Sequence, residues 1–418
     1  MNLAILSPFK SRNYRLYFSG QSMSLIGTWM QKTAVSWVVY SLTNSKFMLG
    51  LSLFASMFPT FLLTSLGGVV ADRYNRHKVL IITQVISMVQ AVLLTLLIYF
   101  GHYVIWEVIA LSVLLGIVNA FDVPARQSLV YEMVDDKKYL PNALALNSSM
   151  VNLSRLIGPA IAGFIIEAFG DAVCFGLNAL SFIAVIISLL SMRLPQYTQK
   201  PHVKSVFGEL EEGWNYLKRS PEISFLLLML GLIGLFVTSF TTLIPVFARD
   251  VFHGTATTFG FIDSAIGLGA FAGALFLASL KSTANLRRIL GVNTLILGAG
   301  LALFSHTANY PLALAFATLG AFGMMSQVTI VNTIIQTTVA PEMRGRLISF
   351  YAMVAFGMQP LGSLLIGTVS HYISVQNTVL IEGLIALAIG GIHLYYVHRR
   401  KPDNKQLYID AAGEARAA

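Results

Sequence analysis

Residues 67–80 read GGVVADRYNRHKVL and join two long apolar runs of the chain. The segment carries Asp72, Arg73, Arg76 and Lys78 within seven residues, although only 11% of all residues of the chain are charged. Two glycines precede these charges. Small residues let helices approach closely in lipid, so the glycines predict a tightly packed membrane helix that ends here in a charged loop.

The composition explains the apolar runs on both sides of this loop. The chain has 418 residues, is 56% hydrophobic and has a mean hydropathy of +0.70. Soluble domains carry about 25% charged residues, so much of this surface must face lipid. A membrane helix needs roughly 20 apolar residues. Twelve such runs can be marked, at about 16–40, 47–71, 79–100, 104–127, 143–168, 172–192, 223–248, 257–280, 288–307, 311–336, 347–370 and 376–397. We therefore predict an all-α integral membrane protein with twelve transmembrane helices.

Basic residues are distributed unevenly among the connections between these runs. Most of the 28 lysines and arginines fall on alternate connections and on the two ends of the chain. The remaining connections hold only Lys46 and Arg249. Cytoplasmic loops are rich in Lys and Arg, so the pattern predicts that both termini are cytoplasmic. The net charge of +9 then reports membrane topology and does not indicate a nucleic-acid partner.

A polar segment divides the runs into two sets of six. We predict an N-terminal six-helix bundle over 1–193, a cytoplasmic linker with an amphipathic helix over 194–221, a C-terminal bundle over 222–400 and a cytoplasmic tail over 401–418. The linker helix has either a role in gating or none beyond connecting the bundles. A duplicated helical unit around a central polar path is typical of transporters.

The opening segment resembles the signature of the Major Facilitator Superfamily between spans 2 and 3, carried here by Gly68, Asp72, Arg73 and Arg76. The stretch RLIGPAIAG (155–163) resembles the Gly-Pro signature of exporters in that superfamily and makes Gly158, Pro159 and Gly163 a helix-packing motif. With FDVPARQSLV (121–130), the chain looks most like the subgroup that contains the bacterial enterobactin exporter. The resemblance implies two pseudo-symmetric six-helix bundles, proton-coupled export across a bacterial inner membrane, and a monomer.

The signature also implies a cytoplasmic gate. By analogy with the superfamily, Asp72 lies near the start of span 11, whose helix end is positive. Arg76 follows one turn later and is expected to reach Asp122 in span 4. The predicted gate consists of Gly68, Asp72, Arg73, Arg76 and Asp122. The alternative is that the basic residues only set the topology.

Polar and charged residues inside the apolar runs are the candidates for a substrate site. A charge at a helix centre costs about 2.5–3.5 kcal/mol, so such residues usually face a cavity or a partner. Lys32 lies on one helical face with Gln21, Ser24, Thr28 and Ser36. The predicted substrate cavity consists of Thr28, Lys32, Ser36, Asn119, Asn152, Arg155 and Thr333. Structural ion pairing is the alternative for Lys32 and Arg155.

Asp122 and Asp263 are the acids predicted to carry a coupled proton, whereas Glu382 is expected near the outer interface without a role. No pair of histidines has ligand spacing on one face, so no metal site is predicted. The sequence has no phosphate-cradling Gly-x-x-x-x-Gly-Lys-[Ser/Thr] loop, which argues against direct use of ATP. We find no pattern typical of an enzyme active site, and we expect no cofactor.

These features predict a secondary active transporter that exports a small organic molecule, such as a siderophore or a drug, in exchange for protons by alternating access. The expected partners are this molecule, protons and the lipid bilayer. Uptake or facilitated diffusion by the same fold is the alternative. A membrane-embedded enzyme or a lipid-handling protein is the alternative from another class.

Overall fold

The computed structural model describes residues 3–101, 103–194, 206–280 and 285–399, and all regular structure in these ranges is helical. The first long helices are α1 (Arg12–Thr43), α2 (Lys46–Arg73), α3 (Arg76–Phe100), α4 (Ile105–Met133), α5 (Leu140–Phe169) and α6 (Asp171–Leu190). After α7 (Val206–Arg219) come α8 (Pro221–Phe236), α10 (Ala256–Ala278), α11 (Leu286–Ser305), α12 (Tyr310–Thr338), α13 (Pro341–Tyr372) and α14 (Val375–Arg399). The predicted all-α membrane fold is therefore confirmed.

Eleven helical segments of the described chain are long and apolar enough to cross a membrane. Helix α1 is not among them, although its 32 residues exceed the length of a span. Its mean hydropathy is low because it carries polar residues such as Gln21, Ser24 and Lys32. The count of twelve spans, with α1 as the first, remains a prediction.

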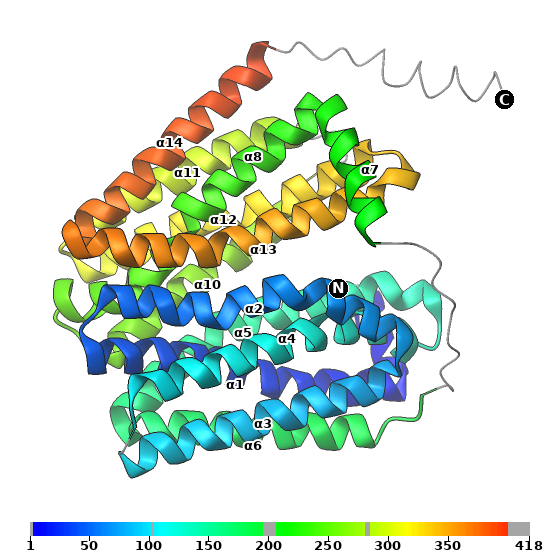
Figure 1. Cartoon of the computed structure of the whole chain (residues 1–418), viewed down its shortest axis with the longest axis horizontal. Helices are drawn as coiled ribbons and strands as arrows, with labels where there is room; N and C mark the ends of the chain where they lie inside the picture. The colour runs from blue at the N-terminus through cyan, green and yellow to red at the C-terminus, as the bar shows by residue number, and fades with distance from the viewer. Residues whose placement is uncertain (1–2, 102, 195–205, 281–284, 400–418) are drawn as a thin grey trace.

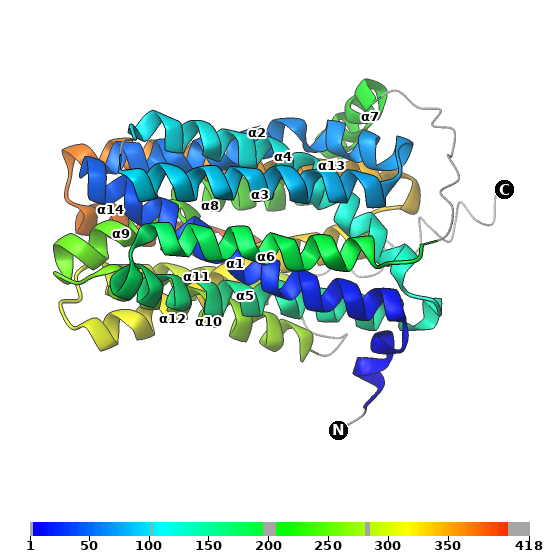
Figure 2. The same ribbon diagram turned by 90° about the horizontal axis from the view of Figure 1, so that it is seen from below.

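The helices form two sets that lie on either side of the molecule's centre (Figure 1). Helices α1–α6 make one set and α8–α14 the other, and the helices of both sets run along the same general direction (Figure 2). The two sets meet where α5 packs on α10 and α2 packs on α13. Their division into two domains remains a prediction, and the tail 401–418 lies outside the described residues.

The predicted run 223–248 does not form one continuous α-helix. Helix α8 ends at Phe236 and is followed by the 3-10 helix η3 (Thr238–Leu243), the short α9 (Ile244–Val246) and a π-helical turn, η4 (Phe247–Val251). Pro245 has no N–H group to continue the helical ladder. The hydroxyl of Thr238 donates to the carbonyl of Gly234 where α8 ends.

The linker contains the helix α7, which contacts the start of α13. The guanidinium of Arg346 pairs with Glu212, and the ring of Trp214 packs against that of Phe350. Residue Gly213 faces the same ring closely. The linker helix is thus attached to the second set of helices, while residues 195–205 lie outside the description.

The two ends of the helices differ in charge. We call one the basic end, because the turns and helix ends there carry Arg73, Arg76, Lys137, Lys138, Arg193, Arg287, Arg288, Arg344, Arg346 and Arg399. The opposite end carries Lys46 and Arg249 among its described residues. This arrangement follows from the alternation of basic residues seen in the sequence.

Candidate functional site

A cluster of charges forms where α1, α5 and α10 come together. The ammonium of Lys32 lies 4.8 Å from the centre of the Trp29 ring, and the guanidinium carbon of Arg155 lies 5.6 Å from the same centre. A cation over an indole face is attracted by the negative ring surface. Trp29 therefore holds two cations, one from its own helix and one from α5.

The carboxylate of this cluster comes from the other set of helices. Asp263 in α10 interacts electrostatically with both Lys32 and Arg155. The hydroxyl of Thr33 lies 3.3 Å from its Oδ2 atom. Three charges that the sequence places in spans 1, 5 and 8 thus meet at the boundary between the two sets.

The charged cluster lies on accessible surface although many protein atoms surround it. The residue Lys32 is exposed, and Arg155, Asp263 and Trp29 are half-buried. A side chain within a dry core would be fully covered. The cluster is therefore not sealed inside a protein core, which suits a site for a polar solute.

Glycines bring the three helices close enough for these charges to meet. A methyl group at Gly158 would lie 2.6 Å from the Cβ atom of Trp29, so α5 packs directly on α1 there. A methyl at Gly260 of α10 would lie 2.4 Å from the carbonyl of Pro159, and one at Gly163 would meet Ala256. The Gly-Pro segment of α5 is thus enclosed by α1 on one side and α10 on the other.

The uncharged residues predicted for the cavity bond within their own helices. The side chains of Thr28, Ser36, Asn152 and Thr333 each donate to the backbone carbonyl four residues earlier. Such bonds leave the oxygen of a hydroxyl free to accept a further hydrogen bond. Asn119 is half-buried in α4.

Asp122 has a different environment from Asp263. It is 3% exposed, and its Oδ2 atom accepts bonds from Thr83 at 2.9 Å and Gln84 at 2.6 Å. Its Oδ1 atom pairs with Arg126 at 3.0 Å. The carboxylate therefore ties α4 to α3 inside one set of helices and is not part of the charged cluster.

The expected contact between Arg76 and Asp122 is not formed in this structure, and the cytoplasmic gate remains a prediction. Arg76 instead pairs with Glu132 at 2.6 Å and with Asp72 at 3.4 Å. Glu132 lies ten positions after Asp122 in α4, which moves it about 15 Å along the helix axis. It thus reaches the level of the α2–α3 loop, where Arg73 also lies, whereas Asp122 lies too deep.

The two glycines of the opening segment do not share one role. A methyl group at Gly67 would lie 1.9 Å from the carbonyl oxygen of Ala120, so α2 and α4 are in backbone contact there. A methyl at Gly68 would meet nothing within 4 Å. The close packing expected of both glycines holds at Gly67 alone.

Contacts at the end opposite the basic loops could not be predicted from the sequence. The hydroxyl of Tyr40 in α1 donates to Asp250 in η4, and the guanidinium of Arg249 lies over the Tyr40 ring. The ammonium of Lys46 donates to the carbonyl of Ser370 at 2.8 Å. Tyr40 gave no signal because a tyrosine near a helix end is ordinary in membrane proteins.

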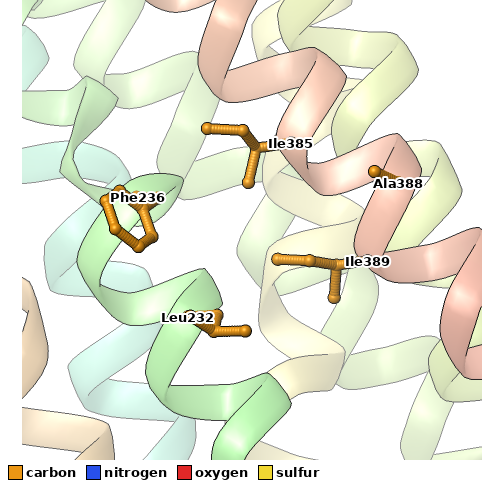
Figure 3. A pocket seen from close by; sticks show the side chains of 5 residues that line it. All are labelled: Leu232, Phe236, Ile385, Ala388 and Ile389. Atoms are coloured by element: carbon orange, nitrogen blue, oxygen red, sulfur yellow. The ribbon is translucent and has the colours of Figure 1, made fainter.

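A cavity of about 280 Å³ lies elsewhere, between α8 and α14 (Figure 3). It is lined by Leu232, Phe236, Ile385, Ala388 and Ile389. All five side chains are apolar, so the cavity offers no group to orient a polar solute. The charged cluster is therefore the better candidate for the functional site.

The sequence matches the model of a known family, described as Transmembrane secretion effector, over residues 3–412. The chain belongs to this family of the Major Facilitator Superfamily. The resemblance found in the GGVVADRYNRHKVL segment is thus confirmed. As a family member with bacterial exporters among its relatives and with membrane-spanning helices, the chain is a multi-pass transporter of the bacterial inner membrane.

Several characterised relatives are transporters of small molecules. The chain is 26% identical to the Staphyloferrin A transporter of Staphylococcus aureus, over 92% of this chain and 96% of the relative. It is 26% identical to the enterobactin exporter EntS of Shigella boydii, over 93% and 92%. It is 24% identical to the multidrug efflux pump Tap of Mycolicibacterium fortuitum, over 88% and 92%. These relatives are transporters and not enzymes, which agrees with the prediction from the sequence that this chain is not an enzyme.

Solved structures agree with the fold. The nucleoside transporter NupG superposes with a TM-score of 0.73 at 12% identity, over 91% of this chain and 98% of that one. A bacterial homologue of the human lysosomal transporter Spinster superposes with a TM-score of 0.66 at 15% identity, over 92% and 95%. At this level of identity the likeness concerns the fold alone.

Proposed function

We propose that the chain is a secondary active exporter that couples the efflux of a small organic molecule to protons. The observation that supports this proposal is the cluster of Lys32, Arg155 and Asp263 between the two sets of helices. Transporters of this architecture bind substrate near the membrane midplane, at the interface of their repeats. Charges held there are costly and therefore favour a functional role.

The orientation in the membrane follows from the two ends. Because Lys and Arg concentrate on cytoplasmic loops, the basic end faces the cytoplasm in this proposal, and both termini with it. The contacts of Tyr40 with Asp250 and of Lys46 with Ser370 join the two sets at the far end. The structure is therefore proposed to be the state that receives substrate from the cytoplasm. We also propose that the protein works as a monomer.

Asp263 is the proposed proton-binding group. It lies on accessible surface, and one hydroxyl contacts it. Asp122 is less suited, because two hydrogen bonds and one ion pair already engage both of its carboxylate oxygens. Exchange of an inward proton for an outward substrate requires that the two exclude each other at Asp263. An uncharged or cationic substrate that contacts the carboxylate would meet that requirement.

The relatives suggest which molecules to test. Their names cover a staphyloferrin A transporter, an enterobactin exporter and macrolide efflux proteins. We therefore propose a siderophore or a drug as the substrate.

Inside-out membrane vesicles test the proposal, because an exporter accumulates its substrate inside them. Vesicles with and without the protein are given labelled staphyloferrin A, enterobactin or erythromycin while respiration acidifies their lumen. We expect accumulation of at least one compound, its loss with a protonophore, and loss of the response to the proton gradient in Asp263→Asn.

The alternatives give different results in the same system. Accumulation only in right-side-out vesicles would show uptake. Accumulation that a protonophore does not change would exclude protons as the coupling ion.

A further inference from the structure

The charges of the central cluster do not balance. Lys32 and Arg155 supply two positive charges and Asp263 one negative charge, which leaves one positive charge in excess. The other helices packed around Asp263 do not change this net charge. The described residues of α12 (Tyr310–Thr338) contain no Asp, Glu, Lys or Arg. Toward the far end, Arg249 and Asp250 of η4 lie together on Tyr40, and Glu167 of α5 accepts a bond from Thr255.

In the part of the chain that the structure describes, the cations of the cluster have no directly bound carboxylate. Within the described residues, neither Lys32 nor Arg155 has a carboxylate oxygen within 4 Å, and their close neighbour is the Trp29 ring. Asp263 is instead contacted by the Thr33 hydroxyl. The cations thus interact with the carboxylate from a distance without being bound by it, so their N–H groups can still bind a second negative group.

We infer that the central site takes an organic anion, and that this anion binds together with a proton that is taken up by Asp263. The inference rests on the proposed function for the location of the substrate site. For an anion it replaces the proposed exchange, in which substrate and proton exclude each other at Asp263, with joint binding of the two.

Simple electrostatics gives the sign of this coupling. An anionic group between Lys32 and Arg155 brings a negative charge near Asp263 and engages the cations that favour the ionised carboxylate. Both effects favour the protonated form. A proton from water then binds one carboxylate oxygen of Asp263, and no other bond forms or breaks. By linkage, a lower pH must strengthen anion binding to the same degree.

The hydroxyl of Thr33 can form a hydrogen bond with Asp263 in both its ionised and its protonated form. Its hydroxyl lies 3.3 Å from Asp263 Oδ2 and 3.2 Å from the carbonyl oxygen of Trp29, and one hydroxyl hydrogen cannot serve both acceptors well. When Asp263 is protonated, its O–H donates to the Thr33 oxygen, and the Thr33 hydrogen turns to the Trp29 carbonyl. Both forms of Asp263 are therefore hydrogen-bonded.

The joint binding has a consequence for export. An anion with two or more negative charges still carries net negative charge when one proton accompanies it. Outward movement of that pair is favoured by a membrane potential that is negative inside. For an anionic substrate, the membrane potential would then take the place of the proton exchange proposed above as the driving force.

Binding measurements on the purified protein in lipid nanodiscs test the inference without any transport step. The probes are 2-naphthoate, 2-naphthamide and 2-naphthylmethylamine, which share a ring system and differ in charge. Calorimetry at pH 6, 7 and 8 in buffers of different ionisation enthalpy gives both the affinity and the number of protons taken up. We expect naphthoate to bind most tightly, with uptake of up to one proton per anion and with tighter binding at lower pH.

Variants separate the roles of the charges. Asp263→Asn is expected to bind naphthoate about tenfold more tightly at pH 8, because one repulsive charge is removed, and to take up no proton. Lys32→Met and Arg155→Met are expected to bind it about tenfold more weakly. Glu382→Gln is the matched control for losing a buried membrane acid, and it should retain the wild-type proton uptake.

Several results would overturn the inference. These are equal or absent binding of all three probes, proton release when naphthoate binds, or weaker naphthoate binding in Asp263→Asn. Failure of the proposed function would instead appear in the vesicle experiment, as missing accumulation of the relatives' substrates.

Discussion

At the scale of single residues, the environment of a carboxyl group decides what it can do. Asp122 has three bonding partners inside one set of helices. Asp263 interacts from a distance with two cations that belong to the other set. Glu382 is 1% exposed, and neither of its carboxyl oxygens has a hydrogen-bond partner. The three acids thus correspond to a structural tie, a candidate proton site and an unsatisfied polar group.

Replacing Asp122 should affect stability more than coupling. Asp122→Asn leaves the half-buried guanidinium of Arg126 without its carboxylate, and we expect a loss of about 1–3 kcal/mol in the free energy of unfolding. Thermal unfolding in detergent would measure it. Vesicle transport by the surviving protein should still respond to the proton gradient, unlike that of Asp263→Asn, and a lost response would make Asp122 a coupling residue.

Replacing Glu382 should stabilise the protein. A buried polar group without a partner costs about 1–3 kcal/mol, and leucine removes that cost at similar volume. We expect Glu382→Leu to unfold at a higher temperature than the wild type and to transport normally. A well-folded variant without transport would show that Glu382 has a function beyond the packing of α14.

At the scale of helices, glycine contacts set the distances between axes. The opening segment offers a matched pair for testing this. Gly67→Ala would force a methyl group into the carbonyl of Ala120, and we expect a loss of roughly 1–3 kcal/mol. Gly68→Ala meets no atom and should be neutral or stabilising by up to about 1 kcal/mol, since alanine favours the helix.

Unfolding temperatures of the two variants provide the comparison. Equal losses of stability in the two variants would mean that Gly68, the glycine that matches the family signature, also has a packing role. Unequal losses in the expected order would assign the packing role to Gly67.

The sequence predicted individual residues better than their partners. Lys32, Arg155 and Asp263 could be singled out because a charge within an apolar run is visible in any sequence. Lys32 and Arg155 were predicted to share one cavity, but that Asp263 joins them there could not be predicted, since the approach of its helix depends on contacts such as that of Gly260 with Pro159. Glu132 was missed because an acid near a helix end in a charged loop breaks no pattern.

At the scale of the whole molecule, the contacts between the two sets gather away from the basic end. Tyr40 bonds Asp250, and Lys46 bonds the carbonyl of Ser370, each across the boundary. Ion pairs at the basic end instead join residues of one set, as Arg76 does with Glu132 and Arg287 with Glu222. The far-end contacts should therefore favour the state that is open toward the basic end.

Weakening one far-end contact should shift the balance between the two states. Tyr40→Phe removes the hydroxyl that donates to Asp250, and one such bond contributes about 1 kcal/mol, or roughly a fivefold change in a two-state population. Spin labels on Ser41 and His306 report the far end, and labels on Lys78 and Arg344 report the basic end. The native Cys174 is buried and should stay unlabelled.

The expected change has opposite signs at the two ends. In Tyr40→Phe the distance between Ser41 and His306 should gain a longer component, while the distance between Lys78 and Arg344 should gain a shorter one. Tyr310→Phe is the matched control, because the Tyr310 hydroxyl bonds the Thr258 carbonyl within one set of helices and should leave both distributions unchanged. Lengthening at the far end without shortening at the basic end would mean local fraying, since rigid rocking of two sets about the central site requires that one end closes as the other opens.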